Sequence, residues 1–342
     1  MNMESDKIDL LGLTLLQLQQ LCAAERFPRF AAKQICDWLY KKRVREIDGM
    51  TNLSLTQRAR LKEIAYIGRE HPVRCQVSKD GTKKYLFPVP NIGHIEAVYI
   101  PDEDRATLCV SCQVGCKMGC HFCVTGQQGF HGNLTSGQIL NQLFSIPEFG
   151  ELTNVVFMGM GEPMDNLDAV LAATQVLTAS DWGMGWSPKR ITVSTVGIIP
   201  GMKRFLDESQ CHLAVSLHNP IPRERLTMMP VQKAFPLNEV LALLRNYDWS
   251  GQRRLSFEYT MFRGENDDLA HAQKLVDALK GLDCRVNLIR FHESSEAPYK
   301  TSLPTTINDF QNYLNRHGIT CTLRASRGQD IDAACGLLAG KE

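Results

Sequence analysis

Apolar residues recur at helical spacing over the first part of the chain, from residue 13 to about residue 61. Pro28 and Gly49 interrupt this pattern and indicate turns. The stretch therefore predicts a small helical domain, which we place at residues 1–68.

The pattern changes between residues 73 and 100 to short runs that are rich in β-forming residues. A tight turn is indicated among them at residues 79–81, where the sequence is Lys-Asp-Gly. We expect a hairpin or a small sheet at residues 69–104 that links the helical domain to the rest of the chain.

Apolar strands alternate with amphipathic helices beyond Arg105. Strands are predicted at residues 107–111, 154–158, 190–195, 212–217, 255–261 and 285–289. Helices are predicted at residues 136–145, 167–179, 238–246, 269–279 and 306–316. This alternation predicts an α/β fold with a parallel, barrel-like sheet, a partial (β/α)6 barrel at residues 105–300. Residues 301–342 are expected to add a C-terminal helix, a strand and a loop.

Polar motifs follow the predicted strands at their carboxyl ends. A cysteine-rich loop follows the first strand, and Gly-Met-Gly-Glu-Pro at residues 159–163 follows the second. Ser194 ends the third strand, and Ser216 and His218 end the fourth. Because ligand sites in parallel sheets lie at this edge, we expect these motifs to share one site.

The Gly-Met-Gly-Glu motif is weak by itself. Gly159 and Gly161 would let a ligand approach the backbone, and Glu162 can accept a hydrogen bond from an ammonium group or a ribose hydroxyl. A simple strand-to-helix turn explains the same residues, and Met164 at the third glycine position excludes a dinucleotide-binding fingerprint. A strand-end serine such as Ser194 can likewise cap a helix without binding a ligand.

Charge is distributed unevenly along the 342 residues, although the net charge is only +1. Residues 26–62 contain ten Lys or Arg against three acidic residues, so this segment carries +7 and the remainder −6. A surface that faces nucleic acid shows such a local excess, although a solvated helix face explains single charge runs more often. No apolar run approaches the ~20 residues that span a bilayer. We expect a soluble, cytoplasmic protein without a membrane partner.

Three cysteines, Cys116, Cys120 and Cys123, form a C-x3-C-x2-C run on one short loop. Three thiolates can hold three corners of a 4Fe–4S cluster and leave one iron open. The usual occupant of that iron in such chains is S-adenosylmethionine, whose carbon–sulfur bond is broken by one electron from the cluster. A zinc site is the alternative reading, and it would need a fourth ligand from Cys112 or His121.

The remaining cysteines of the twelve have different predicted roles. Residues 1–9 do not resemble a secretory signal, so thiols should stay reduced, and six isolated cysteines are expected to pack as small hydrophobes. These are Cys22, Cys36, Cys75, Cys211, Cys284 and Cys321. Cys335 stands on what should be an exposed, flexible tail, where Gly328 and Gly336 permit a loop that folds back over the barrel towards Cys109.

Several uncommon segments occur in a fixed order from about residue 105 to residue 339. They are residues 105–111, 113–116, 127–130, 157–163, 216–218, 297–299 and 330–336. In these segments the chain resembles the RlmN and Cfr family of radical S-adenosylmethionine enzymes, which methylate adenine bases of RNA.

The resemblance implies a mechanism that uses two molecules of S-adenosylmethionine. The first methylates the thiolate of Cys335, and the second binds the open iron. Reductive cleavage yields a 5′-deoxyadenosyl radical that takes hydrogen from the S-methyl group, and the methylene radical adds to C2 of an adenine. Cys109 then resolves the covalent protein–RNA adduct by forming a disulfide with Cys335, and Glu96 serves as proton acceptor.

The resemblance also assigns cofactor contacts and partners. The residues that contact S-adenosylmethionine are Gly161, Glu162, Ser194, Ser216, Leu217, His218 and His292. The implied substrates are an adenosine in the peptidyl-transferase centre of 23S rRNA and the adenosine beside the tRNA anticodon. The basic N-terminal domain is expected to bind the RNA phosphates. A reductant such as flavodoxin and a monomeric state are implied as well.

Three positions depart from the family pattern. His292 stands where a ligand-binding asparagine is expected, Cys112 replaces a common serine, and Leu337 replaces a usual glutamine. An imidazole can also donate a hydrogen bond, so His292 can still contact the ligand.

Two other functions are compatible with these residues. One keeps the chemistry and places the methyl group on C8, as in the Cfr enzymes, although residues 127–130 and 162–163 look more like the C2 type. The other is a non-catalytic RNA-binding protein with a structural metal site, in which residues 26–62 bind the RNA. The co-occurrence of Cys109, the three-cysteine loop and Cys335 favours methylation of C2.

Overall fold

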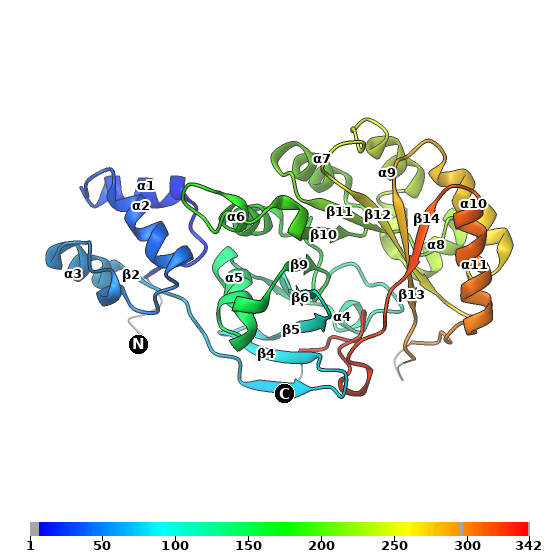
Figure 1. Ribbon diagram of the computed structural model, residues 1–342, viewed down its shortest axis with the longest axis horizontal. Helices are drawn as coiled ribbons and strands as arrows, with labels where there is room; N and C mark the ends of the chain where they lie inside the picture. Colours follow the sequence, from blue (N-terminus) through cyan, green and yellow to red (C-terminus); the bar gives the residue numbers. More distant parts are fainter. Residues whose placement is uncertain (1–6, 294–296, 341–342) are drawn as a thin grey trace.

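The computed structural model describes residues 7–293 and 297–340. A curved ten-stranded sheet forms its centre, helices cover the outer face of the sheet, and the N-terminal helices lie at one end (Figure 1). Within the described ranges, no helix is both long enough and apolar enough to cross a membrane.

The N-terminal region is helical, as the apolar spacing predicts. Its elements are β1 (Ile8–Asp9), α1 (Leu15–Ala24), α2 (Ala31–Cys36), a π-helical turn (Asp37–Lys41), a 3-10 turn (Ile47–Gly49), α3 (Leu55–Ile64) and β2 (Ala65–Tyr66), which pairs with β1. Thr14 and Ser54 begin α1 and α3 with capping boxes, which satisfy backbone N–H groups that have no partner inside the helix. Leu18, Ile35 and Leu61 are completely buried and form its core.

The central sheet has the order β14-β13-β12-β11-β10-β9-β6-β5-β4-β3. Its strands are β3 (Arg74–Val77), β4 (Lys83–Val89), β5 (Gly93–Asp102), β6 (Arg105–Cys109), β9 (Asn154–Phe157), β10 (Ile191–Thr195), β11 (His212–Ser216), β12 (Leu255–Met261), β13 (Arg285–Arg290) and β14 (Thr320–Leu323). Strand β6 and strands β9 to β14 run parallel, which confirms the six predicted barrel strands and adds a seventh.

The β-rich segment before the barrel is part of the same sheet. Strands β3, β4 and β5 run antiparallel, and β5 pairs with β6 so that Val98 lies opposite Cys109. The hairpin expected at residues 69–104 is therefore present, but it extends the barrel sheet and is not a separate sheet. This pairing brings Glu96 of β5 close to the centre of the molecule.

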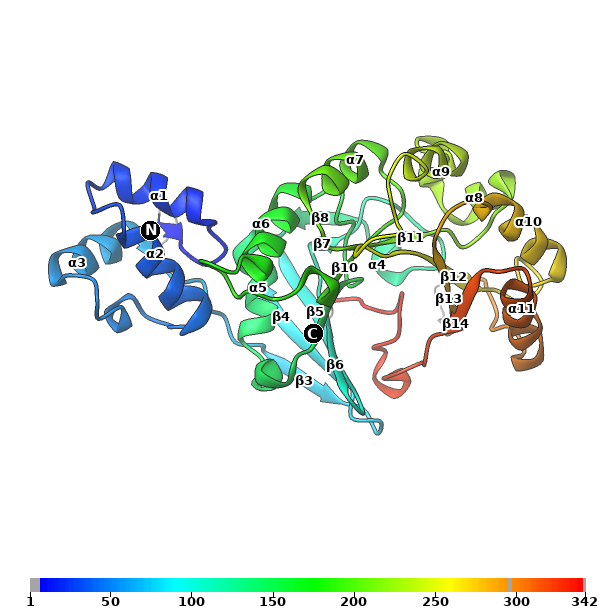
Figure 2. The ribbon, with the colours of Figure 1, turned by 45° about the horizontal axis from the view of Figure 1, so that its top comes forward.

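In the part of the chain that the structure describes, seven helices connect the parallel strands on the outer face of the sheet (Figures 1 and 2). They are α5 (Ser136–Phe144), α6 (Leu167–Thr178), α7 (Ile199–Glu208), α8 (Pro222–Met228), α9 (Leu237–Leu244), α10 (Leu269–Leu279) and α11 (Pro304–Arg316). Five of them match predicted helices, and α7 and α8 do not. Figure 2 shows the C-terminal tail, in red, returning from β14 across the open side of the sheet.

The isolated cysteines behave as predicted with one exception. Cys22, Cys36, Cys211 and Cys321 are buried, and Cys284 is half-buried. Cys75 is exposed, so the prediction that it packs in a core is wrong. The reason is its position on β3, the edge strand of the sheet, where most side chains face solvent.

Candidate active site

A hairpin and a short helix hold the cysteine loop beyond the carboxyl end of β6. These are β7 (Gln113–Gly115), which pairs with β8 (Phe130–Asn133), and α4 (Val124–Gln127). The N–H of Cys116 donates to the carbonyl oxygen of Gly129 at 2.8 Å. Gly115 has a φ of +73°, and a Cβ there would lie 1.9 Å from that oxygen. Only glycine fits this close approach, so Gly115 fixes the start of the loop.

The three thiols of the loop lie within electrostatic reach of one another. Burial raises the pKa of Cys116, to about 12, and that of Cys120, and the neighbouring thiol of Cys123 raises both further. Iron–sulfur clusters are held by cysteine thiolates, and a metal favours loss of the thiol proton, so this donor set fits a cluster with three protein ligands. Across residues 7–293 and 297–340, no three Cys, His, Asp or Glu side chains are arranged to hold a single metal ion.

A cavity of about 150 Å³ opens beside Cys123 at the carboxyl ends of the barrel strands. Five of the seven predicted cofactor residues line it, namely Gly161, Glu162, Ser194, Ser216 and His218. Leu217 directly follows β11 and is completely buried, although its two neighbours, Ser216 and His218, line the cavity. His292 lies apart from this group and lines a second cavity.

Glu162 is fixed between β9 and β10 by backbone hydrogen bonds. Its Oε1 accepts from the N–H of Met164 at 3.0 Å, and its Oε2 accepts from the N–H of Val196 at 2.9 Å. Burial raises the pKa of this carboxyl group to about 7, although these hydrogen bonds lower it. The carboxyl group is therefore held rigidly at the cavity wall, and its remaining lone pairs can accept a hydrogen bond from a ligand.

His218 presents a neutral imidazole to the cavity. Its φ is +55°, a left-handed conformation, and its Nδ1 accepts from the N–H of Thr260 at 3.0 Å. Burial, and then the charge of Arg225, lower the pKa of His218 to about 3. The neutral ring therefore carries its proton on Nε2, which can donate a hydrogen bond to a ligand oxygen.

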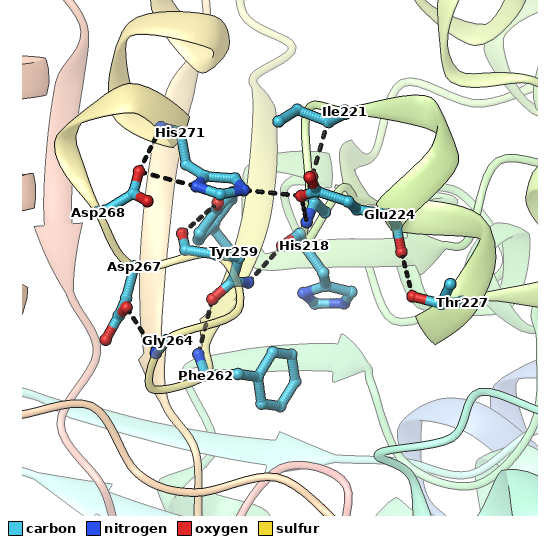
Figure 3. Close-up of polar contacts among 12 residues, drawn as sticks. His218, Ile221, Glu224, Thr227, Tyr259, Phe262, Gly264, Asp267, Asp268 and His271 are labelled. Atoms are coloured by element: carbon cyan, nitrogen blue, oxygen red, sulfur yellow. Dashed lines mark hydrogen bonds and ion pairs between the residues drawn. The ribbon is translucent and has the colours of Figure 1, made fainter.

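A polar network holds the backbone of His218 in place (Figure 3). Asn266 donates from Nδ2 to the carbonyl oxygen of His218 at 2.6 Å. Farther out, His271 on α10 bonds Glu224 on α8 and Asp268, both at 2.8 Å. Burial lowers the pKa of His271, but the two carboxylates outweigh it and raise the pKa above 6.5.

The raised pKa of His271 predicts a pH-dependent contribution to stability. The contribution is complete below the unfolded-state pKa of about 6.5 and is lost as pH rises through the higher folded-state pKa. We expect His271→Gln to lower the free energy of unfolding by about 1 kcal/mol at pH 6 and by less at pH 9, measured by urea denaturation. An equal loss at both pH values would contradict this. His317→Gln, at an exposed histidine directly after α11, is the matched control.

Cys335 lies where two cavities meet. It lines the cavity that contains Glu162 and His218, and it also lines the second cavity, so its side chain is exposed to both. The tail that carries it is packed and not free: the Val124 N–H donates to Gly336 at 2.8 Å, and the Thr125 hydroxyl donates to Leu338 at 2.6 Å. The tail therefore folds over the open side of the barrel.

Cys109 and Arg324 adjoin this thiol. Burial raises the pKa of Cys109 to about 12, and Cys335 raises it further, so the two thiols lie within electrostatic reach of each other. Both are free thiols here. Arg324 lines the same two cavities as Cys335, lies 3.5 Å from Glu258 Oε2, and opposes the effect of burial on the pKa of Cys335. No motif in the sequence selects Arg324; the only signal is a charged residue directly after strand β14.

Glu96 is buried at the base of the tail and does not line the first cavity. Its Oε1 lies 3.1 Å from Lys84 Nζ, and its Oε2 accepts from the N–H of Ala339 at 2.8 Å. In this conformation Glu96 holds the tail against β5. The carboxylate of Glu96 therefore contacts the backbone of the tail four residues after Cys335.

Comparisons with known proteins agree with this arrangement. Residues 8–67 match the family described as ribosomal RNA large subunit methyltransferase N-terminal domain, and residues 110–276 match the radical SAM superfamily. A protein of Phocaeicola vulgatus named "Probable dual-specificity RNA methyltransferase RlmN" is 57% identical over 337 residues, 98% of this chain and 96% of that protein. The "Dual-specificity RNA methyltransferase RlmN" of Syntrophus aciditrophicus is 41% identical and covers 99% of this chain and 98% of its own.

A solved structure is similar over nearly the whole chain. It is a radical SAM methyltransferase from Sphaerobacter thermophilus, with a TM-score of 0.90 and 40% sequence identity. The match covers 98% of this chain and 100% of that chain. The similarity therefore includes the N-terminal helices, the antiparallel hairpin and the barrel together.

Proposed function

Because the chain belongs to the RlmN family of radical S-adenosylmethionine RNA methyltransferases, we propose that it methylates C2 of adenosine in 23S rRNA and in tRNA. Enzymes of this superfamily use a 4Fe–4S cluster and S-adenosylmethionine. The observation that supports the specific proposal is the position of Cys335. Its thiol adjoins Cys109 and lies between the cavity that suits the cofactor and a second cavity.

We assign the cluster to Cys116, Cys120 and Cys123, and S-adenosylmethionine to the adjacent cavity. When bound, the cluster supplies the electron that cleaves the carbon–sulfur bond of S-adenosylmethionine. His218 can donate from Nε2 and Glu162 can accept, so the cavity offers both partners that an amino acid moiety and a ribose require. Ser194 and Ser216 add hydroxyl groups at neighbouring strand ends.

Cys335 is proposed to take the first methyl group by displacement. Its thiolate attacks the methyl carbon of S-adenosylmethionine, a carbon–sulfur bond forms at Cys335, and S-adenosylhomocysteine leaves with the electron pair. The thiolate is the reactive form. Burial raises the pKa of Cys335, and the adjacent guanidinium of Arg324 opposes this effect. Glu258 holds Arg324 in this place and is itself held by Asn287 at 2.8 Å.

Cys109 is proposed to release the product. Its sulfur attacks the sulfur of Cys335 in the protein–RNA adduct, the bond from Cys335 to the new methylene carbon breaks, and a disulfide forms while that carbon is protonated. Glu96 remains the predicted proton acceptor. Its contact with the N–H of Ala339 ties Glu96 to the tail that carries Cys335.

The N-terminal helices are proposed to bind RNA phosphates. Half of the ten basic residues in residues 26–62 are paired with acids, which leaves five cations without an acidic partner among the described residues. These are Arg26, Arg29, Arg43, Arg45 and Arg58. Further proposals are a flavodoxin-type reductant, a monomeric enzyme and action in the cytoplasm, where the RNA substrates are made.

The proposal is tested with protein that is reconstituted anaerobically with iron and sulfide. The protein is incubated with S-adenosylmethionine, a reductant and either a 23S rRNA fragment or tRNA, and the RNA is digested and separated by liquid chromatography with mass spectrometry. We expect 2-methyladenosine from both RNAs. 8-Methyladenosine would favour the Cfr-type alternative. Cleavage of S-adenosylmethionine without any RNA methylation would contradict the substrate assignment.

A further inference from the structure

Basic residues stand at the amino ends of neighbouring barrel strands. Lys189 lies just before β10, Arg254 just before β12, and Arg285 begins β13. These strands are adjacent in the order β13-β12-β11-β10 and run parallel, so their amino ends share one edge of the sheet. The edge lies opposite the carboxyl edge, where the cofactor cavity is found. We call Lys189, Arg254 and Arg285 the amino-edge cations.

Positive charge exceeds negative charge around the amino-edge cations. All three side chains are exposed and line one shared cavity, whose only acidic residue is Asp283. Within the described part of the chain, none of the three donates a side-chain hydrogen bond or forms an ion pair. Arg253 differs, because it donates to the carbonyl oxygens of Leu206 and Ser209 at the end of α7. Arg253 therefore has a structural role, whereas the other three do not.

Positive charge accumulates here enough to perturb neighbouring groups. Burial and then the charges of Arg254, Lys189, Arg253 and Arg285 lower the pKa of His212 to about 4. Like charges that lie close together without partners repel one another and destabilise the fold, and a bound anion would relieve this repulsion. The span from β10 to β13 is three strand spacings, about 14 Å, which is too wide for one phosphate and suits a chain of several.

We infer that the amino-edge cations bind consecutive phosphates of the RNA substrate, as a contact surface separate from the N-terminal helices. This inference rests on the proposed function for its ligand. The surface leads towards the reaction centre, because Arg254 lies within electrostatic reach of Arg105, and Arg105 lines the second cavity together with Cys335. RNA on this edge would reach Cys335 from the side opposite the cofactor.

A triple variant, Lys189→Gln with Arg254→Gln and Arg285→Gln, tests the inference through RNA affinity. The dissociation constant for a 23S rRNA fragment is measured by filter binding at several salt concentrations. We expect the logarithmic salt slope to lose about 2 in magnitude, because each phosphate contact contributes about 0.7 to 0.9. The affinity near physiological salt should fall on the order of 10- to 100-fold. The melting temperature should be unchanged or higher, since self-repulsion is relieved.

Two further proteins make the result decisive. A control triple variant removes the same charge from exposed positions on or next to α10 and α11, with the substitutions Lys274→Gln, Lys280→Gln and Arg316→Gln. It should leave the salt slope unchanged. Arg254→Lys with Arg285→Lys should keep the slope of the unmodified chain. An unchanged slope in the first triple variant, or an equal loss in the second, would overturn the inference. A failure of the proposed function would instead be absence of methylation in the unmodified chain, which this binding measurement does not involve.

Discussion

Replacement of Cys335 by alanine is expected to abolish RNA methylation while RNA affinity stays unchanged. The thiol lies between the two cavities and is the only side chain proposed to carry the methyl group, so no other residue can take over its role. We expect a loss of roughly 1000-fold or more, as for removal of other covalent nucleophiles. Methylation is measured by transfer of labelled methyl groups to a 23S rRNA fragment, and affinity by filter binding.

The control for this experiment is Cys75→Ala. Cys75 is also an exposed cysteine, but it lies on the edge strand β3, and its replacement should leave methylation intact. Residual methylation in the Cys335→Ala protein at a rate close to that of the control would show that the tail thiol does not carry the methyl group.

Replacement of Cys109 by alanine is expected to stop turnover at a later point and to trap RNA on the protein. Cys109 adjoins Cys335 and is buried, so bulk thiols cannot substitute for it easily. Labelled RNA should then migrate with the protein on a denaturing gel, and the attachment should map to Cys335. The amount of free methylated RNA should fall by roughly 100-fold or more.

Cys211→Ala serves as the matched control, because Cys211 is a buried thiol that precedes β11 at the amino edge. It should neither trap RNA nor slow methylation. If the Cys109→Ala protein releases methylated RNA at the normal rate and no RNA stays attached, the proposed role of Cys109 is wrong.

The apolar pattern predicted the barrel well because its strands are buried on both faces. Strand β12 is buried at every position, and its predicted and observed bounds coincide. Helices α7 and α8 were missed for local reasons. A proline and a glycine occupy the first turn of α7, and α8 is a seven-residue helix without a complete amphipathic repeat.

The three-cysteine loop could be selected from spacing alone, whereas other parts of the candidate site depend on long-range pairing. Arg324 reaches Cys335 only because β14 pairs with β13 and the tail then folds back, a contact that no local pattern encodes. His292 lies just after the end of β13 and lines the second cavity with Arg290. Its position after a strand end therefore does not bring it into the cavity that Glu162 lines. The hydrogen bond from the N–H of Ala339 to Glu96 joins residues 243 positions apart.

The most direct measurement follows a labelled methyl group on the protein itself. The chain is incubated with S-adenosylmethionine that carries a labelled methyl group, digested, and the peptide that contains Cys335 is analysed by mass spectrometry before and after addition of RNA. Our account predicts one labelled methyl on Cys335 before RNA is added, and its carbon in adenosine afterwards. Labelled adenosine formed by a protein whose Cys335 never carries the label would contradict the account.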